Sequence, residues 1–377
     1  MYAFNTKNPS SSLFHHDMQR HAAFSTHRIV HDLGTVRYSG VAVDDSNFKA
    51  RDLLVGYILE IDVTSDFSTY SSNYVEDFAY AFLDRVELHI DNDVVQTVYG
   101  EHLRIMNRMS PMRDSWASNA AIYEPSSVTG QRAGKIAYVH VPFFFTEDGS
   151  ALPVVKLNAT PVKIIVHTSS RARTVSSTNA PMPKLRTHKL MVDLESEEEK
   201  ALLMGNPYMC DFANTAFVRF AVSPTSTTGS SVISRLPFTG AVSCLYIVSS
   251  TKDDSHTSLD YSVYDSDNDA HVNPFESLSL QIDGTEYFAP QSAHYYTLAI
   301  PAQAGAHCLF SDNVAMMPFN LQPMSNRQTG TLSLKPIQNA DLVFQLNAFV
   351  TVERYVKVFA TIRKVIRIGD NSLKTMQ

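Results

Sequence analysis

Residues 84–91 read Asp-Arg-Val-Glu-Leu-His-Ile-Asp, and residues 276–283, 192 positions later, read Glu-Ser-Leu-Ser-Leu-Gln-Ile-Asp. In both stretches apolar residues alternate with polar ones up to an Asp, which is typical of a half-buried β-strand that ends in a turn. A second pair follows in the same order, because residues 157–164 correspond to residues 337–344, 180 positions on. Loop length costs little free energy whereas strand patterning is constrained by packing, so two nearly equal offsets indicate a tandem duplication of one β-unit.

The rest of the chain supports two β-domains. Its 377 residues exceed the usual size of one hydrophobic core. Period-two patterns dominate, as where Leu342, Phe344 and Leu346 share one face, and only residues 101–109 and 196–205 are typical of helices. With shorter candidates included, each half holds about eight strands. We therefore expect an all-β protein of two tandem eight-stranded antiparallel jelly rolls with few short helices.

Composition changes along the chain predict the domain boundaries. The first residues are polar, rich in His and without periodicity, which favours an arm that becomes ordered only against a partner. A stretch rich in Ser, Thr, Asn, Ala and Pro ends at Pro183 and is typical of a linker. The expected parts are an N-terminal arm (1–27), a first jelly roll (28–175), a linker (176–187), a second jelly roll (188–368) and a C-terminal tail (369–377).

Composition also excludes several classes of protein. A hydrophobic content of 44% with 18% charged residues is typical of a folded protein and not of a disordered one. The net charge of −7 argues against a chain that coats nucleic acid, and we expect no sequence-specific nucleic-acid binding. Three widely spaced cysteines suggest neither a disulfide framework nor a thiolate metal site. The N-terminal sequence has no apolar segment typical of secretion signals, so we do not expect a secreted protein.

Local motifs predict no enzyme and no cofactor. The chain contains no nucleophile elbow, no zinc-protease helix motif and no glycine-rich phosphate loop. Asp265, Asp267, Asp269 and Glu276 imitate the ligand spacing of a calcium loop, but Ala270 stands where that loop needs glycine for its sharp turn. We interpret this segment as a solvated acidic loop and predict no metal site.

Two surface features allow more than one interpretation. Arg363, Lys364 and Arg367 end the last long strand, and could contact an acidic partner, a membrane surface or nucleic acid, or could simply discourage strand-edge pairing. Five tyrosines could form a ligand face in a carbohydrate- or receptor-binding β-sandwich, the alternative function: Tyr261, Tyr264, Tyr287, Tyr295 and Tyr296. A metal-dependent enzyme of cupin type would need a cluster of His and carboxylate ligands, and the chain has no closely spaced His pair of that kind.

The order of several motifs resembles that of the double jelly-roll major capsid proteins of large eukaryotic DNA viruses and their relatives. The segments that carry the resemblance are Arg51–Leu59, Val86–Leu103, Val141–Phe145, Ala151–Leu157, Leu190–Glu195 and Asn320–Leu334. The family's Ile-Gly-Gly turn is here Ile90-Asp91-Asn92, and the Trp of its Phe-Trp-Phe strand is absent. The matching order of the segments spans about residues 35–366.

The resemblance implies a structural protein of the virion capsid. Such a protein would form homotrimers with a pseudo-hexagonal outline, the capsomers of an icosahedral shell, and would catalyse no reaction. Its expected partners are other copies of itself, neighbouring capsomers, minor capsid or penton proteins and an internal membrane layer. Assembly would take place in the host cytoplasm or nucleus. Arg363, Lys364 and Arg367 would then face the interior of the shell.

Overall fold

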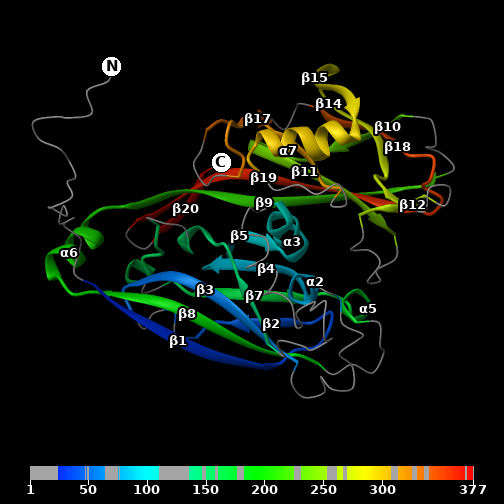
Figure 1. The fold of residues 1–377 in the computed structure, drawn as a ribbon. Helices are drawn as coiled ribbons and strands as arrows, with labels where there is room; N and C mark the ends of the chain where they lie inside the picture. The colour runs from blue at the N-terminus through cyan, green and yellow to red at the C-terminus, as the bar shows by residue number, and fades with distance from the viewer. Residues whose placement is uncertain are drawn as a thin grey trace, which may run out of the picture.

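The computed structural model describes residues 24–46, 48, 51–63, 75, 77–109, 136–146, 150–157, 160–175, 182–224, 231–252, 261–265, 270–306, 313–324, 329–334, 339–369 and 372–376. Strands make up most of this part of the chain, and they form two sandwiches stacked on one another (Figure 1). The expected all-β fold with few short helices is confirmed.

The first sandwich contains two four-stranded antiparallel sheets. One has the order β1-β8-β3-β6 and the other the order β2-β7-β4-β5. Consecutive strands thus alternate between sheets except at the β4–β5 hairpin, which is the connectivity of a jelly roll. The strands are β1 (Phe24–Thr35), β2 (Val41–Asp44), β3 (Leu53–Asp62), β4 (Leu83–Ile90), β5 (Asp93–Tyr99), β6 (Ile136–His140), β7 (Val162–Thr168) and β8 (Lys184–Leu194).

The second sandwich repeats this order strand for strand. One sheet contains β9-β19-β11-β16, extended by β20 beside β19 and β17 beside β11, and the other contains β10-β18-β14-β15. A separate hairpin of β12 and β13 lies outside both. The strands are β9 (Tyr208–Val222), β10 (Ser231–Leu236), β11 (Gly240–Thr251), β12 (Val263–Asp265), β13 (Ala270–Val272), β14 (Phe275–Ile282), β15 (Thr285–Ser292), β16 (Ala315–Pro318), β17 (Leu332–Leu334), β18 (Ala340–Leu346), β19 (Arg354–Gly369) and β20 (Ser372–Met376).

The sequence repeat corresponds to equivalent strands of the two rolls. β4 and β14 begin equivalent hairpins, and each hairpin turns at an Asp with positive φ, Asp91 (φ 60°) and Asp283 (φ 51°). The Asp91 amide donates to the Pro161 carbonyl and the Asp283 amide donates to the Asn339 carbonyl, both at 2.8 Å. Pro161 therefore corresponds to Asn339, and the second offset is 178 rather than the predicted 180. A slip of two residues keeps every side chain on its own face, so the alternating pattern could not reveal it.

The boundary between the rolls differs from the predicted one. β8 pairs along its length with β1 and β3 and so completes the first roll, although the prediction began the second roll at residue 188. Helix α6 (Glu197–Gly205) follows, as the sequence predicts, and the second roll starts with β9. Residues 24–27, predicted as arm, begin β1; residues 372–376 of the predicted tail form β20. Residues 1–23 of the predicted arm lie outside the described residues.

The sequence analysis did not recognise all of β1 because three of its inward positions, Ser25, His27 and His31, are polar. His31 has the same orientation as Ile29 and Leu33, which pack against the first core, but its Nδ1 lies 2.9 Å from a carboxylate oxygen of Asp44. Asp44 is fully buried on the opposite sheet and accepts hydrogen bonds from Tyr57 and Thr187 as well. The fully buried Lys189 ammonium lies 2.7 Å from the same carboxylate. This polar cluster joins the two sheets of the first roll.

The helices lie mainly at the ends of the sandwiches and between them (Figure 1). They are α2 (Phe78–Phe82), α3 (Gly100–Met109), α5 (Arg171–Thr174) and α6, with short helical turns η3 (Phe144–Thr146) and η4 (Val154–Leu157). In the second roll a π-helical turn, η7 (Tyr295–Ala299), continues into α7 (Ile300–Gln303). α3 and η7–α7 follow equivalent strands, β5 and β15. Within the described residues, no helix is long and apolar enough to cross a membrane.

Candidate functional site

The junction between the two rolls is where helix α3 of the first roll packs on the outer face of the β9-β19-β11-β16 sheet of the second. Ile105 and Met109 of α3 join a buried apolar cluster with Tyr246 of β11 and Phe359 of β19. A helix laid across a sheet face buries apolar surface from both partners and holds the two rolls in one orientation.

Glu101, in the first turn of α3, is the centre of a buried charge network across this junction. It is 6% exposed and accepts hydrogen bonds from Lys357 of β19, at 2.9 and 3.1 Å, and from Arg173 of α5, at 2.7 Å. The Tyr261 hydroxyl donates a further bond at 3.1 Å. Burial alone would raise the pKa of Glu101, but the two cations and the hydrogen bonds lower it to about 2. Burial also lowers the pKa of Lys357, which Glu101 partly offsets.

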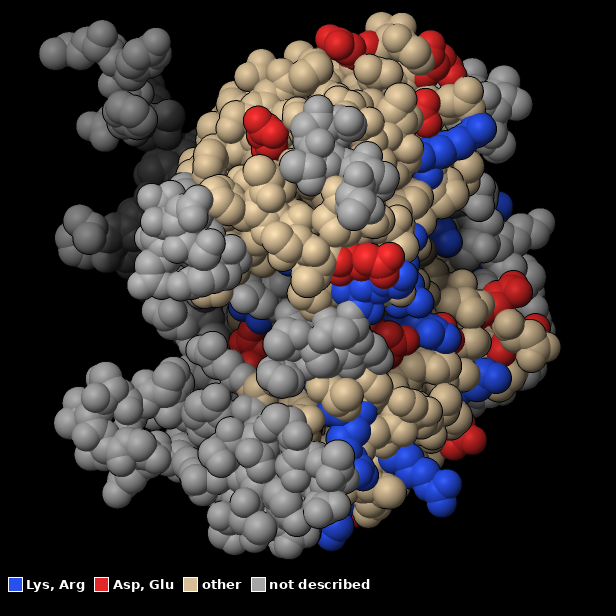
Figure 2. Space-filling view, turned by 90° about the vertical axis from the view of Figure 1, so that its right-hand side faces the viewer, with Lys and Arg blue, Asp and Glu red and all other residues tan. Residues whose placement is uncertain are grey.

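A second ion pair on α3 extends the network. Arg104 Nε lies 2.6 Å from a carboxylate oxygen of Asp77, and Arg108 reaches the same oxygen at 3.7 Å. Both guanidinium groups also lie over the ring of Tyr261, at 5.4 and 5.8 Å from its centroid. On the face drawn in Figure 2, charged side chains of both signs gather in a band between the upper half, the second roll, and the lower half, the first.

His102 contributes to the same junction as a neutral aromatic ring. Its ring lies 5.6 Å from that of Phe359 at an interplanar angle of 24°, and edge-on to Tyr246. Its Nδ1 lies 3.2 Å from the Thr215 hydroxyl. Burial lowers the pKa of His102 to about 4, so the imidazole is uncharged at neutral pH.

Strand β5 is held against β9 by polar contacts beside α3. The Gln96 side-chain amide donates to the Ala213 carbonyl at 2.8 Å and accepts from the Phe144 amide at 2.8 Å. The Thr97 backbone amide donates to the Asn214 side chain at 2.9 Å. The first roll thus presents one edge strand and one helix to the sheet of the second roll.

The equivalent elements of the second roll are more exposed, although Tyr296 and Thr297 of η7 and Pro301 of α7 are buried. Every residue of β15 except Phe288 is exposed, in contrast to the half-buried β5. Tyr287 and Tyr295 are 53% and 44% exposed, and Leu321 is 84% exposed. The rings of Tyr287, Phe288 and Phe319 are mutual neighbours, and Tyr296 joins Phe288 to Tyr295. We call the exposed residues Tyr287, Tyr295 and Leu321 the β15 patch.

The first roll has a matching uncovered surface. The outer face of its β1-β8-β3-β6 sheet is equivalent to the face that α3 covers in the second roll. Val30 and Tyr138 lie exposed on it, at 54% and 40%. Between them, Glu60 is paired with His188 at 2.7 Å and Arg186 at 3.0 Å. We call this surface, defined by Val30, Glu60, Tyr138, Arg186 and His188, the β1 face.

The residues singled out from the sequence fall in separate places. Arg363 and Lys364 of β19 line a cavity of the second roll, and Arg367, on the same strand, is exposed and pairs in register with Lys374 of β20. Tyr287, Tyr295 and Tyr296 come together, but Tyr261 lies in the junction, so the five tyrosines form no single face. Tyr264 is in β12, and its side chain is outside the description.

The acidic loop cannot be judged from the described residues. Asp265 ends β12 and Glu276 lies in β14, whereas Asp267 and Asp269 are outside the described part of the chain. In the residues that are described, no group of three or more His, Cys, Asp or Glu side chains could hold a metal ion. The prediction of no calcium site therefore stays a prediction.

Sequence reasoning missed the junction itself. Glu101 belongs to a predicted helix, but its partners lie 72, 160 and 256 residues away. The local sequence carries no signal for it, because the burial of Glu101 and Arg104 on α3 is known only from the structure. Charged residues buried in a helix indicate partners from elsewhere in the chain.

Comparison with known proteins finds similarity to viral major capsid proteins. The family model described as "Major capsid protein N-terminus" matches residues 12–204, just over half of the chain. A major capsid protein of Pyramimonas orientalis virus is 21% identical over 393 aligned positions, which cover 96% of this chain and 92% of the relative.

Solved structures agree in fold. VP54 of PBCV-1 superposes with a TM-score of 0.80 at 17% identity, covering 97% of this chain and all of VP54. The Faustovirus major capsid protein gives a TM-score of 0.69 at 9% identity, covering 96% and 93% of the two chains. Major capsid proteins are structural components and not enzymes, in agreement with the motif analysis. The chain therefore belongs to the major capsid protein family of large DNA viruses, with the double jelly-roll fold.

Proposed function

We propose that this major capsid protein assembles into homotrimers whose six rolls form a pseudo-hexagonal ring, and that these capsomers tile an icosahedral shell. One observation carries the proposal: β5 and α3 of the first roll are covered by the second roll, while their equivalents are more exposed. β15 is exposed at every residue except Phe288, and η7 leaves Tyr295 exposed although its Tyr296 and Thr297 are buried. Within one chain, the first roll contacts the second roll through β5 and α3. The β15 patch of the second roll and the β1 face of the first roll are the two surfaces that could form an equivalent contact between chains.

The internal contact has the geometry of a ring interface. A strand and helix of one roll meet the sheet face of the next, so the two partners use different surfaces, as in a head-to-tail interface. Such contacts generate closed rings or open filaments according to the rotation between units. If the β15 patch of one copy meets the β1 face of the next copy in the same way, every second junction lies between subunits. Closure after six rolls requires three chains.

The surfaces are suited to each other in chemistry. The β15 patch is aromatic and aliphatic, and the β1 face offers Val30 and Tyr138 around a charged centre that is already paired internally. Because Glu60 is paired with Arg186 and hydrogen-bonded to His188, an apolar partner could cover it without leaving an unpaired carboxylate. The proposed junction between subunits is therefore mainly apolar, in contrast to the charged junction within each subunit.

Light scattering combined with substitution tests the proposal. We expect a particle of three times the 42.0 kDa chain mass. Tyr295→Lys and Val30→Lys should each convert it to monomer, because each places a charge in the contact. Ile233→Lys, at a 66% exposed position of β10 outside both surfaces, is the matched control and should remain trimeric. A wild-type monomer that binds glycans through Tyr287 and Tyr295 would instead favour the alternative carbohydrate-binding function.

The same proposal includes the other components of the virion that would contact the trimer. Neighbouring capsomers, minor capsid or penton proteins and an internal membrane layer would contact the outer surfaces of the trimer in the virion, after assembly in the host cytoplasm or nucleus. Arg363, Lys364 and Arg367 would face the interior, as their place on the part of β19 nearest β20 supports. An amine reagent that cannot penetrate particles should then modify Lys364 in isolated trimers and spare it in intact shells; equal modification would contradict this orientation.

A further inference from the structure

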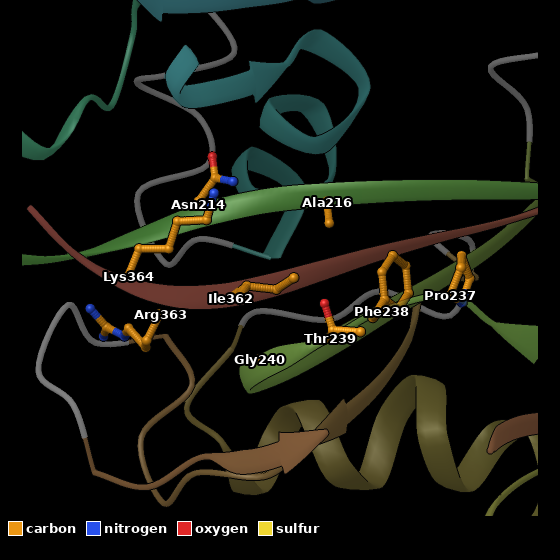
Figure 3. A pocket seen from close by; sticks show the side chains of 9 residues that line it. All are labelled: Asn214, Ala216, Pro237, Phe238, Thr239, Gly240, Ile362, Arg363 and Lys364. Carbon is orange, nitrogen blue, oxygen red and sulfur yellow. The ribbon is translucent and has the colours of Figure 1, made fainter. Parts of the chain in front are cut away.

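A cavity of about 200 Å³ opens in the second roll between β9, β19 and the segment that joins β10 to β11 (Figure 3). β9 contributes Asn214 and Ala216, and β19 contributes Ile362, Arg363 and Lys364. The joining segment contributes its three residues Pro237, Phe238 and Thr239, and β11 contributes Gly240. The volume is sufficient for one side chain of moderate size, and no larger cofactor would fit.

The polar part of the lining favours an anion. It contains two cationic side chains and no carboxylate. Arg363 is 8% exposed, and Figure 3 shows Lys364 extending along β19 toward Asn214. Asn214 uses its side-chain oxygen to accept from the Thr97 amide, so the amide nitrogen is the atom left to donate. Within the part of the chain that the structure describes, no Asp or Glu is paired with Lys364. Such a lining attracts a negatively charged acceptor.

The floor of the cavity is apolar. Phe238 and Ile362 belong to the core of the second roll, and Ala216 packs against it. Gly240 has φ +98°, and a Cβ there would lie 3.4 Å from Ile362, so glycine permits the turn that borders the cavity. A fully hydrophilic ion such as phosphate would lose hydration against this floor without compensation. A carboxylate on a short apolar stem can place its charge at Lys364 and its methylene groups on Ile362, which Figure 3 shows between Lys364 and Phe238.

We infer that this cavity binds a glutamate side chain presented by an acidic segment of a partner protein. Glutamate has the required charge and two methylene groups, and it fits the size of the cavity. The inference depends on the residues of one roll alone, so it stands or falls separately from the proposed trimer. It also gives Lys364 a defined role as the cation of a binding site.

Saturation-transfer NMR on the purified full chain provides the test. The probes are the capped dipeptides N-acetyl-Leu-Glu-amide and N-acetyl-Leu-Gln-amide, which differ only in the charged group. We expect the Glu peptide to bind and the Gln peptide to bind about tenfold more weakly, as expected for loss of a charge-assisted hydrogen bond. Lys364→Met should abolish the difference, and Lys364→Arg should preserve it. Lys184→Met, at an exposed position of β8, is the matched control and should change nothing.

Four outcomes would overturn the inference. Equal binding of the two peptides would remove the role of charge, and undiminished binding to Lys364→Met would place the peptide elsewhere. Displacement of the Glu peptide by an equal concentration of inorganic phosphate would identify a simple anion site. Binding of hexanoate without binding of the Glu peptide would indicate a lipid-derived ligand and contradict a protein partner. A thermal unfolding profile of Lys364→Met identical to that of the wild type shows that the comparison concerns folded protein.

Discussion

Lys357 of the second roll donates hydrogen bonds to both carboxylate oxygens of Glu101 of the first roll, at 2.9 and 3.1 Å, and both side chains are at most 7% exposed. The orientation of the two rolls therefore depends on a charge pair that neither roll could accommodate alone. A buried charge without its partner is costly, whereas a complete pair contributes modest net stability and specifies one arrangement.

Removing one partner of this pair should destabilise the junction strongly. We expect Lys357→Met to lower the free energy of unfolding by about 3–5 kcal/mol, because Glu101 stays buried with less compensation. The double variant Glu101→Gln with Lys357→Met should lose less than the sum of the single variants, with a coupling of about 1–3 kcal/mol in a denaturant-unfolding cycle. Lys252→Met breaks the exposed pair with Glu353 and is the control, with an expected loss under about 1 kcal/mol. Additive single effects would contradict direct coupling.

Acid should weaken the junction in two separate pH ranges. The folded pKa of His102 is about 4, below its unfolded value of 6.5, so the unfolded chain binds the proton first. The stability that neutral His102 provides is thus complete above pH 6.5 and is lost as pH falls toward 4, by up to about 3 kcal/mol. Glu101, with a folded pKa of about 2 against 4.5, adds a loss between pH 4.5 and 2.

Substitution can assign these ranges. His102→Phe keeps a ring against Phe359 and should flatten the dependence of unfolding free energy on pH between 6.5 and 4. Glu101→Gln should reduce the dependence below 4.5. Thermal unfolding followed across this pH range measures both effects, and an unchanged slope in His102→Phe would show that another group titrates there.

Gly100 sets the position of α3. A Cβ at this residue would lie 2.1 Å from the Leu83 carbonyl oxygen and 2.5 Å from that of Tyr80, both of them backbone atoms that cannot move alone. Gly100→Ala should therefore displace the start of α3 and cost several kcal/mol, roughly the upper range for single substitutions. Gly205→Ala at the end of α6 is the matched control, because nothing lies within 4 Å of its Cβ position. Equal melting temperatures for the two variants would contradict the steric argument.

Particular residues show what the sequence could and could not predict. β4 and β14 were recognised because alternation and a closing Asp are local signals that both copies retain. β8 was assigned to the second roll because its partner β1 lies about 160 residues earlier and contains inward-facing histidines instead of apolar residues. Arg363 and Lys364 were selected as basic residues, but only the fold places Asn214 and Phe238 beside them. The assignment of β8 and the surroundings of Arg363 and Lys364 both depend on contacts between distant parts of the chain, which a single sequence does not show.

The polar cluster of the first core yields a final prediction. Asp44 of β2 and Lys189 of β8 are both fully buried, and Asp44 also accepts hydrogen bonds from Tyr57 of β3 and Thr187 of β8. Side chains of three strands therefore meet at one carboxylate. Among the described residues, Lys189 is the only fully buried cation beside Asp44. Lys189→Met should therefore lower the free energy of unfolding, measured with denaturant, by about 3–5 kcal/mol. Asp44→Asn with Lys189→Met should recover part of that loss, since the amide can still accept from Tyr57 and Thr187 while no charge remains buried. Because the Asp44 cluster belongs to strands of the first roll, the loss should appear as earlier exchange of backbone amides in β2 and β8 while those of β10 and β19 stay protected. Uniform loss of protection in all four strands would instead show that the two rolls unfold as one unit.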